Sequence, residues 1–197
     1  MKNKSVLVSA ILCSSSLLAQ QKPNIVLIVA DDMRGSTLEF MGKEQIKTPT
    51  LNQLAQESVV FNNAHIMGGT SAAVSMPSRA MLMTGKYLYN LESKGATIPN
   101  EHTIIGEMLR GAGYNTFHTG KWHNGKDSFN RSFSQDNDIF FGGMYDHWNV
   151  PLFSYDTSGE YKDKRKVIKN AWANNEGEIL EGEYVKSGIH SVDIFTD

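Results

Sequence analysis

Three pairs of side chains in this sequence are suited to binding an anion and a metal ion. They are Asp31 with Asp32, Ser75 with Arg79, and Lys121 with His123. Paired carboxylates suit a hard divalent cation, a hydroxyl is a potential nucleophile, and cationic groups hold anions. The residue types therefore predict a site for an anion with a place for a divalent cation.

The acidic pair follows a continuous apolar run at 24–30. The run is rich in β-branched residues, which indicates a strand buried on both faces of a parallel sheet. Two adjacent carboxylates repel each other unless a cation lies between them. Asp31 and Asp32 are therefore predicted metal ligands, with a helix cap or a solvated turn as the alternative.

Ser75 is expected just before a helix that runs from Pro77 to Thr84 and ends at Gly85. The electropositive end of that helix would stabilise negative charge near the hydroxyl. Arg79, one turn on, returns along the same face and can hold an anion. The alternative is an ordinary serine cap with a surface arginine.

Lys121 and His123 follow a predicted strand at 114–119. Alternate residues of an extended segment point the same way, so both side chains could face one site. Lysine offers a point charge for an anionic substrate, and histidine moves protons at neutral pH. A structural histidine is the alternative.

The predicted elements around these residues alternate between strand and helix, which indicates an α/β fold. Further elements are expected as a helix from Thr48-Pro49, a short strand at 59–61, a helix at 103–110, and a helix start at 190–197. Residues 127–180 are expected to form a long loop region. Ligands of open α/β sheets bind beyond the carboxyl ends of the strands, where the three pairs would meet.

The charge balance and the N-terminal segment limit the class of protein. The 197 residues include 19 basic and 21 acidic side chains, so a dedicated nucleic-acid binder is not expected. Residues 1–19 have the layout of a secretory signal peptide, with an apolar run too short to span a bilayer. The only cysteine, Cys13, lies within it. We expect an exported protein, periplasmic or secreted, without a membrane span.

Together the motifs resemble those of the sulfatases in the alkaline-phosphatase-like superfamily. The resemblance is carried by the segments 23–32, Ser75-Met76-Pro77-Ser78-Arg79 with Thr84-Gly85, 113–116 and Gly120-Lys121-Trp122-His123. They stand in the family's order, and residues 191–197 resemble the family's next helix. The resemblance implies a sandwich with a mostly parallel central sheet flanked by helices, incomplete in this chain.

The resemblance also implies roles for individual residues. Ser75 matches the residue that sulfatases oxidise to formylglycine, whose hydrate attacks a sulfate ester. Asp31, Asp32 and the modified Ser75 match ligands of a divalent cation, Ca²⁺ with Mg²⁺ as the alternative. Arg79 matches a residue that steadies the hydrate. Lys121 matches a sulfate contact, and His123 matches a group that assists regeneration of the aldehyde.

The substrate implied is a sulfated carbohydrate or an aryl sulfate ester. His147 is a candidate substrate contact from the long loop region, with a surface or structural histidine as the alternative. The aromatic residues Trp148, Trp172, Tyr155 and Tyr161 could stack on sugar rings, although core packing is the default for such side chains.

Two features depart from the family's usual pattern. Most sulfatases have a cysteine at the position of Ser75, and the serine form resembles a bacterial branch matured by an anaerobic formylglycine-forming enzyme. The second departure is length, since further metal ligands, another lysine and another histidine would follow Asp197. Residues 22–197 are thus expected to be the truncated N-terminal part of a sulfatase catalytic domain, with little activity alone.

Two other functions are consistent with these residues. A phosphodiester or phosphonate monoester hydrolase of the same superfamily would bind an anion of similar shape but different charge. The second alternative is a truncated product without catalytic activity. Oxidation of Ser75 distinguishes the enzyme from the truncated product, and paired assays with aryl sulfate and aryl phosphonate distinguish the two hydrolases.

Overall fold

The computed structural model describes residues 22–42, 45–65, 67, 74–91, 95–168 and 178–197. The chain divides into two compact units, Met1–Met33 and Arg34–Asp197, and each is described by itself. Within the first unit the described residues are extended and end in a turn at Asp31 and Asp32. Among the described residues, no helix is both long and apolar enough to cross a membrane.

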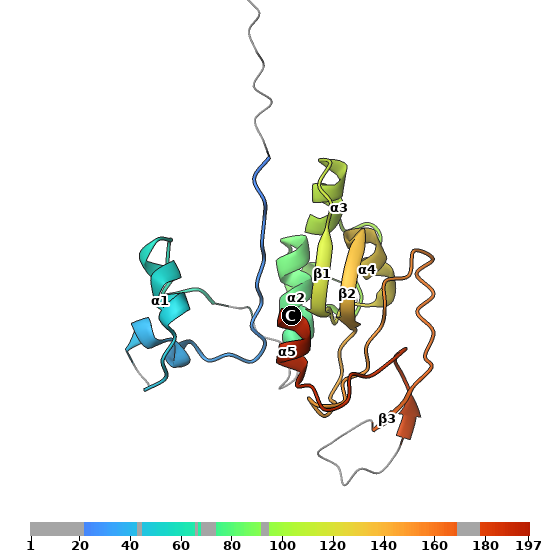
Figure 1. The fold of residues 1–197 in the computed structure, drawn as a ribbon. Helices are drawn as coiled ribbons and strands as arrows, with labels where there is room; N and C mark the ends of the chain where they lie inside the picture. The colour runs from blue at the N-terminus through green and yellow to red at the C-terminus, as the bar shows by residue number, and fades with distance from the viewer. Residues whose placement is uncertain (1–21, 43–44, 66, 68–73, 92–94, 169–177) are drawn as a thin grey trace, which may run out of the picture. The chain divides into compact units, whose positions relative to one another are not determined.

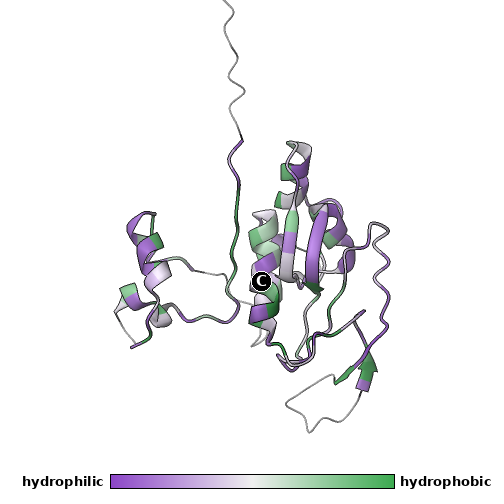
Figure 2. Cartoon of the chain, viewed as in Figure 1, coloured by the Kyte–Doolittle hydropathy of each residue, from purple (hydrophilic) through white to green (hydrophobic). Residues whose placement is uncertain are grey.

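The strand expected at 24–30 is not formed. The segment is extended, has no strand pairing, and exposes its apolar side chains, with Ile28 at 85% exposure. Figure 2 shows this apolar stretch along the extended chain. A strand buried on both faces needs paired neighbours and covering helices. The prediction is wrong for this chain because the segment finds neither among the described residues.

Two parallel strands and the helix between them form the framework of the second unit. Strand β1 (Phe117–Lys121) pairs with β2 (Gln135–Phe140), and helix α4 (Lys126–Ser132) connects them. Because the strands are parallel, both carboxyl ends emerge at the same edge (Figure 1). The residues that follow β1 and β2 are therefore brought to one side of the sheet.

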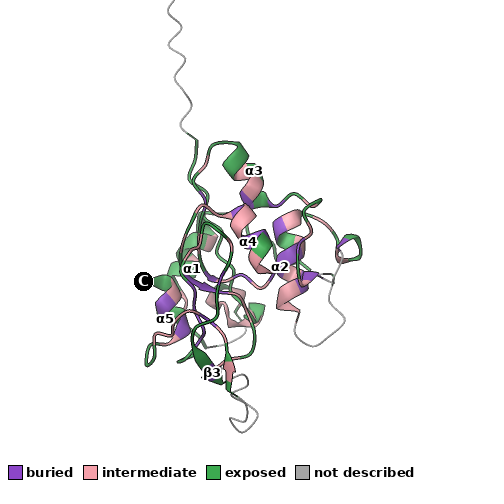
Figure 3. Ribbon diagram, turned by 90° about the vertical axis from the view of Figure 1, so that its right-hand side faces the viewer, coloured by how far each residue is buried: buried purple, intermediate pink, exposed green. Residues whose placement is uncertain are grey.

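Three helices pack around this framework. Helix α3 (Ile105–Gly111) packs on α4 and contacts α2 (Ser75–Thr84), while α5 (Ser191–Thr196) contacts both strands. Figure 3 shows that α2 and α5 each carry buried as well as exposed residues. The core between the elements is largely aromatic and centres on Trp122 and Phe129.

The remaining elements are short. They are the 3-10 helices η1 (Gly35–Thr37), η2 (Glu39–Met41) and η3 (Leu88–Asn90), helix α1 (Pro49–Gln56), and the antiparallel strands β3 (Lys166–Ile168) and β4 (Glu178–Leu180). The start of α1 is held by the Glu39 carboxylate, which accepts from Lys47, from the Thr48 amide and from Asn52. The bond from Lys47 is the main reason that the pKa of Glu39 falls to about 2.

The predicted helices agree with the structure better than the predicted strands. The helix expected at 103–110 is α3, and the helix start at 190–197 is α5 with His190 as its cap. The strand expected at 114–119 begins three residues later and ends two residues later, as β1. Residues 59–61 are exposed and form no strand. The region expected to be a loop contains α4, β2, β3 and β4.

A bulge interrupts the pairing of β1 with β2 beside the end of β1. Thr119 pairs with Asn137 but Gly120 pairs with Ile139, so Asp138 is the extra residue. Asp138 has a left-handed φ of 57° and is buried. Its carboxylate accepts hydrogen bonds of 2.8 Å from both Tyr184 and Lys186. Since bulges redirect neighbouring side chains, this one sets the direction in which the chain leaves β1.

A second buried carboxylate makes folding depend on pH. Burial, with the charge of Asp138 as a second cause, raises the pKa of Asp136 to about 8. Burial likewise lowers the pKa of its partner His118, 3.2 Å away, to about 4. A low-dielectric site favours the neutral forms of both groups. Asp136 and His118 therefore form a neutral hydrogen-bonded pair near pH 7.

The signs of these two shifts give a testable pH profile. As the pH falls from 6.5 toward about 4, the unfolded chain binds a proton at His118 that the folded protein does not, so the folded protein loses stability. As the pH rises toward about 8, the folded protein keeps a proton on Asp136 that the unfolded chain has lost, so it loses stability again. Above pH 6.5, Asp136 is the member of this pair that makes stability depend on pH, so the free energy of unfolding should fall by up to about 2 kcal/mol by pH 8. Denaturant titrations across this range should show that Asp136→Asn removes the fall. The exposed control Asp127→Asn should retain it, and an unchanged slope in Asp136→Asn would refute the assignment.

Candidate active site

Ser75 is the first residue of α2, rather than the residue before the helix as predicted. Its Oγ lies 3.0 Å from Nδ1 of His123 and 3.3 Å from Nζ of Lys121. The ammonium donates to Oγ, and the hydroxyl proton can then be donated to an unprotonated Nδ1. In this orientation each of the three groups has a hydrogen-bonding partner at the site.

The end of β1 and the turn after it bring Lys121 and His123 to Ser75. Between them, Trp122 is buried in the core, and its Nε1 donates to the carbonyl of Gly125 at 2.8 Å. His123 has a left-handed φ of 70°, which is unusual for a residue with a side chain. Lys121 and His123 thus reach one hydroxyl, and they do so through a left-handed turn rather than through the strand alternation on which the prediction of a shared site was based.

Arg79 is buried one turn after Ser75. Its guanidinium donates to the carbonyl of Lys121 at 2.6 Å, which ties α2 to the end of β1. The alternative of a surface arginine is therefore wrong. The positive charge of Arg79 also contributes, after burial, to the lowered pKa of His118.

The surroundings of Ser75 favour an anion. The amide groups at the start of the ten-residue helix α2 carry partial positive charge, and the charges of Arg79 and Lys121 add to it. Ser75, Lys121 and His123 are all partly exposed, so a ligand can reach them. A tetrahedral oxyanion placed against the hydroxyl would meet a positive, hydrogen-bonding surface.

Two residues that the sequence analysis does not single out hold this arrangement. Asn124 is buried, and its amide donates to the carbonyls of Met76 at 2.9 Å and Gly95 at 2.6 Å. Gly142 approaches the His123 ring so closely that a Cβ there would overlap the imidazole. The signals in the sequence were the position of Asn124 directly after His123 and the Gly-Gly pair at 142–143.

Gly142→Ala should therefore displace the imidazole of His123. We expect a loss of stability of about 1–3 kcal/mol from the positive φ of 112°, together with loss of the imidazole's contact with Ser75. Chemical shifts of the His123 ring, measured by NMR, report the displacement. Gly42→Ala is the matched control, since Gly42 has a φ of 69° and nothing within 4 Å of a Cβ. Equal ring shifts in both variants would contradict the prediction.

A comparison with protein families decides which family this chain belongs to. The family model described as Sulfatase matches residues 23–177. This chain is a member of the sulfatase family. The matched range contains every site residue predicted from the sequence, from Asp31 to His147. Membership also implies the α/β fold of that family, of which β1, β2 and their helices are a part.

Characterised sulfatases resemble this one over a limited part of their length. An ulvan-active sulfatase of Formosa agariphila is 36% identical over 68% of this chain, and the matched segment is 25% of the length of that relative. An N-acetylgalactosamine-6-O-sulfatase of Bacteroides thetaiotaomicron is 39% identical over 53% of this chain and 21% of its own length. The human N-acetylgalactosamine-6-sulfatase is 30% identical over 79% of this chain and 34% of its own length. The chain thus spans about a fifth to a third of the length of these relatives.

The acidic pair belongs to the first unit, whereas the residues around Ser75 belong to the second. Asp32 has a left-handed φ of 56° in the turn after the extended segment. Within the described residues, no three histidine, cysteine or acidic side chains gather as a metal site requires. Two carboxylates supply fewer than the six to eight oxygens that calcium takes. The described residues therefore do not make up a complete metal site.

His147 lies on the loop that follows β2, and its side chain contacts His190 and Ser191 rather than Ser75. Its ring stacks on that of His190 with centroids 5.3 Å apart, and its Nδ1 lies 3.1 Å from Oγ of Ser191. The structure thus gathers Ser75, Arg79, Lys121 and His123 and places His147 in a separate group of aromatic rings.

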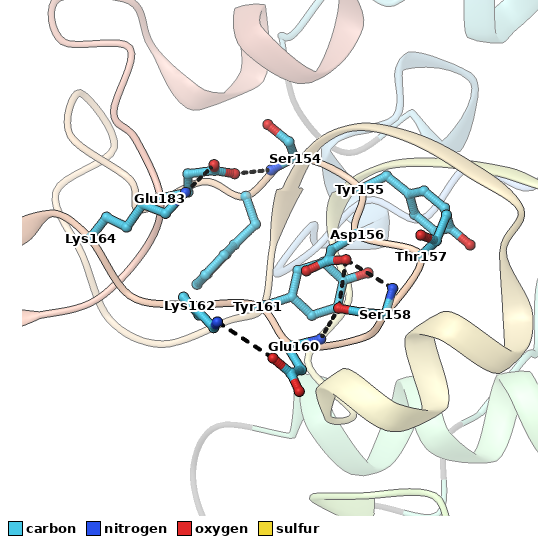
Figure 4. A pocket seen from close by; sticks show the side chains of 11 residues that line it. Ser154, Tyr155, Asp156, Thr157, Ser158, Glu160, Tyr161, Lys162, Lys164 and Glu183 are labelled. Atoms are coloured by element: carbon cyan, nitrogen blue, oxygen red, sulfur yellow. Dashed lines mark hydrogen bonds and ion pairs between the residues drawn. The ribbon is translucent and has the colours of Figure 1, made fainter.

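A shallow cavity of about 350 Å³ lies between the loop 153–164 and Glu183. Two ion pairs line it, Lys164 with Glu183 and Lys162 with Glu160, and the Asp156 carboxylate accepts from the amide and the hydroxyl of Ser158 (Figure 4). Tyr161 is buried in the core, and the hydroxyl of Tyr155 donates to the carbonyl of Phe133 at 3.0 Å. Both tyrosines therefore contribute to core packing, which is the default for aromatic side chains, and both also line this cavity. Trp172 lies outside the described residues.

Proposed function

We propose that this protein hydrolyses sulfate esters of carbohydrates, with the oxidised form of Ser75 as its nucleophile. The observation that supports this best is the position of Ser75 Oγ, 3.0 Å from His123 Nδ1 and 3.3 Å from Lys121 Nζ at the start of α2. An unmodified serine hydroxyl is a weak nucleophile, so the proposal includes oxidation of Ser75 to formylglycine by an anaerobic maturase. When hydrated, that aldehyde supplies an attacking hydroxyl and a second hydroxyl that releases sulfate.

The neighbouring side chains have distinct roles in this proposal. Lys121 binds a sulfate oxygen through Nζ and neutralises the charge that develops there. His123 accepts at Nδ1 the proton of the hydroxyl that remains on the sulfated intermediate. As that proton leaves, the C=O bond of the aldehyde forms and the C–O bond to sulfate breaks, and His123 then gives the proton to the departing sulfate or to solvent. Arg79 holds the carbonyl of Lys121 and keeps the two basic residues directed at one point.

A divalent cation, Ca²⁺ or Mg²⁺, is part of the proposal but carries no step in it. Asp31, Asp32 and the modified Ser75 are its proposed ligands because hard cations prefer oxygen donors. Bound there, it would polarise the sulfate oxygens. Its other ligands would come from residues beyond those described.

The substrate and the location of the enzyme are also proposals. The relatives that resemble this chain are named for ulvan and for 6-O-sulfated amino sugars, which supports a sulfated carbohydrate as substrate. An aryl sulfate is the simplest substitute, since an arylsulfatase of Klebsiella aerogenes is 33% identical over 77% of this chain. The signal-like residues 1–19 support export to the periplasm or beyond in a bacterium.

The test combines mass spectrometry with paired substrates. The full-length protein is expressed with and without an anaerobic maturase, and the peptide that contains Ser75 is weighed. We expect the maturase to remove two hydrogens and to produce hydrolysis of nitrophenyl sulfate. Faster hydrolysis of nitrophenyl phenylphosphonate would support the phosphonate hydrolase instead. An unmodified Ser75 after maturation would overturn the proposal in favour of a non-catalytic product.

A further inference from the structure

Trp148 is a large aromatic side chain that the fold leaves half exposed, at 51%. Indole rings usually contribute to cores or to binding surfaces, because they combine a large apolar face with a polar edge. The ring of His190 lies edge-on to Trp148 with centroids 5.2 Å apart, and His147 stacks on His190 at 5.3 Å with 10° between the planes. Three rings from two distant segments thus form one aromatic group at the surface.

The backbone that carries this group is held by hydrogen bonds. The carboxylate of Asp146 accepts from the amide of Trp148 at 3.1 Å and from the Asn149 side chain at 2.7 Å. The amide of Ser191 donates to the carbonyl of His147 at 2.8 Å, which joins the loop to the start of α5. The exposed rings are therefore positioned before any ligand arrives, which lowers the entropic cost of binding.

The aromatic group lies at the same edge of the sheet as the Ser75 site. The loop that carries Trp148 leaves β2 at its carboxyl end and touches the His123 ring at Gly142, six residues earlier. The helix that follows His190 packs on β1, where the Phe195 ring comes within 3.3 Å of a Cβ built on Gly120. Six residues of chain reach at most about 20 Å. A glycan bound at Ser75 could therefore extend to Trp148.

We propose that Trp148, with His147 and His190, forms a binding subsite for a pyranose ring adjacent to the sulfated sugar. The placement of the subsite next to a sulfatase centre rests on the proposed function, whereas ring binding itself needs no chemistry at Ser75. The indole face packs against the C–H face of the sugar, and the imidazoles and the Asn149 amide bond to its hydroxyl or sulfate groups. The substrate is then an oligosaccharide or polysaccharide rather than a single sulfated sugar.

Binding measurements on a form that cannot turn over test this subsite. The full chain with Ser75→Ala is titrated with hexasaccharides of chondroitin 6-sulfate, heparin and ulvan, and the affinity is measured by calorimetry. For the hexasaccharide that binds best, we expect Trp148→Ala to weaken binding about tenfold and Trp148→Phe less than about threefold. His190→Ala, which removes the ring beside Trp148, should fall between them.

The matched control is Tyr89→Ala, since Tyr89 is also exposed and stacks on Tyr87 with centroids 5.6 Å apart. It should leave the affinity unchanged, and circular dichroism should show that all variants are folded. Equal losses in Trp148→Ala and Tyr89→Ala, or no binding of any hexasaccharide, would overturn the subsite. Hydrolysis of nitrophenyl sulfate would still support the proposed function in that case. Conversely, Trp148-dependent binding without hydrolysis by the matured full-length protein would contradict the proposed function and support the subsite.

Discussion

Ser75→Ala is expected to lower kcat/KM for nitrophenyl sulfate by at least about 10³-fold in the matured full-length protein. Alanine has no oxygen to oxidise, so the nucleophile cannot be made. The variant also removes the group that Lys121 and His123 share. Initial rates, with the mass of the Ser75-containing peptide measured in parallel, check both the chemistry and the maturation.

The control for this prediction is a serine outside the site. Ser58 is exposed between α1 and the segment that follows it, so Ser58→Ala should retain the wild-type rate. Retention of more than a tenth of the rate in Ser75→Ala would show that another group is the nucleophile. Binding of sulfate by Ser75→Ala should persist, because Lys121 and the start of α2 remain.

His123→Ala is expected to lower kcat by about 10²–10⁴-fold, with a smaller effect on KM. The imidazole lies 3.0 Å from Ser75 Oγ, within hydrogen-bonding distance of the proton that it would accept. Its loss should also flatten the pH dependence of kcat, which a purely structural role would not do. Rates measured across the pH range with nitrophenyl sulfate provide this readout.

The left-handed backbone at His123 calls for a variant that separates geometry from chemistry. Asparagine tolerates a positive φ, so His123→Asn should fold like the wild type while lacking a basic nitrogen. We expect it to be nearly as slow as His123→Ala. His65→Ala, at an exposed position, should be unaffected. Recovery of the rate in His123→Asn would mean that His123 acts only through its shape.

Several parts of this fold could be predicted from local sequence. The helix α2 is signalled by Pro77 in its first turn and by Gly85, which ends it with a left-handed φ of 66°. The start of α5 is signalled by His190, whose side chain accepts from the amide of Val192. These signals work because caps and breakers act within one turn of the residues that carry them.

Other parts could not be predicted because they depend on distant partners. Strand β2 begins with Gln, Asp and Asn, which are poor strand formers, and forms because it pairs with β1. The apolar run at 24–30 is the reverse case. Its pattern favours a strand, but no strand forms because the described residues supply no neighbour with which it could pair. The hydrophobic pattern of a segment indicates its own tendency to form a strand, whereas strand pairing also depends on which other segments lie next to it.

The family of this protein and the chemical types at its candidate site are evident from local sequence, because motifs such as Ser75-Met76-Pro77-Ser78-Arg79 are contiguous in the chain. The folded chain was needed to show that Lys121 and His123 meet at the Ser75 hydroxyl, and that Asp138, Asn124 and Gly142 hold the surrounding backbone. It also shows that Trp148 stays at the surface beside His190. Contacts between residues more than forty positions apart arise from packing of the whole unit, and no local pattern encodes them.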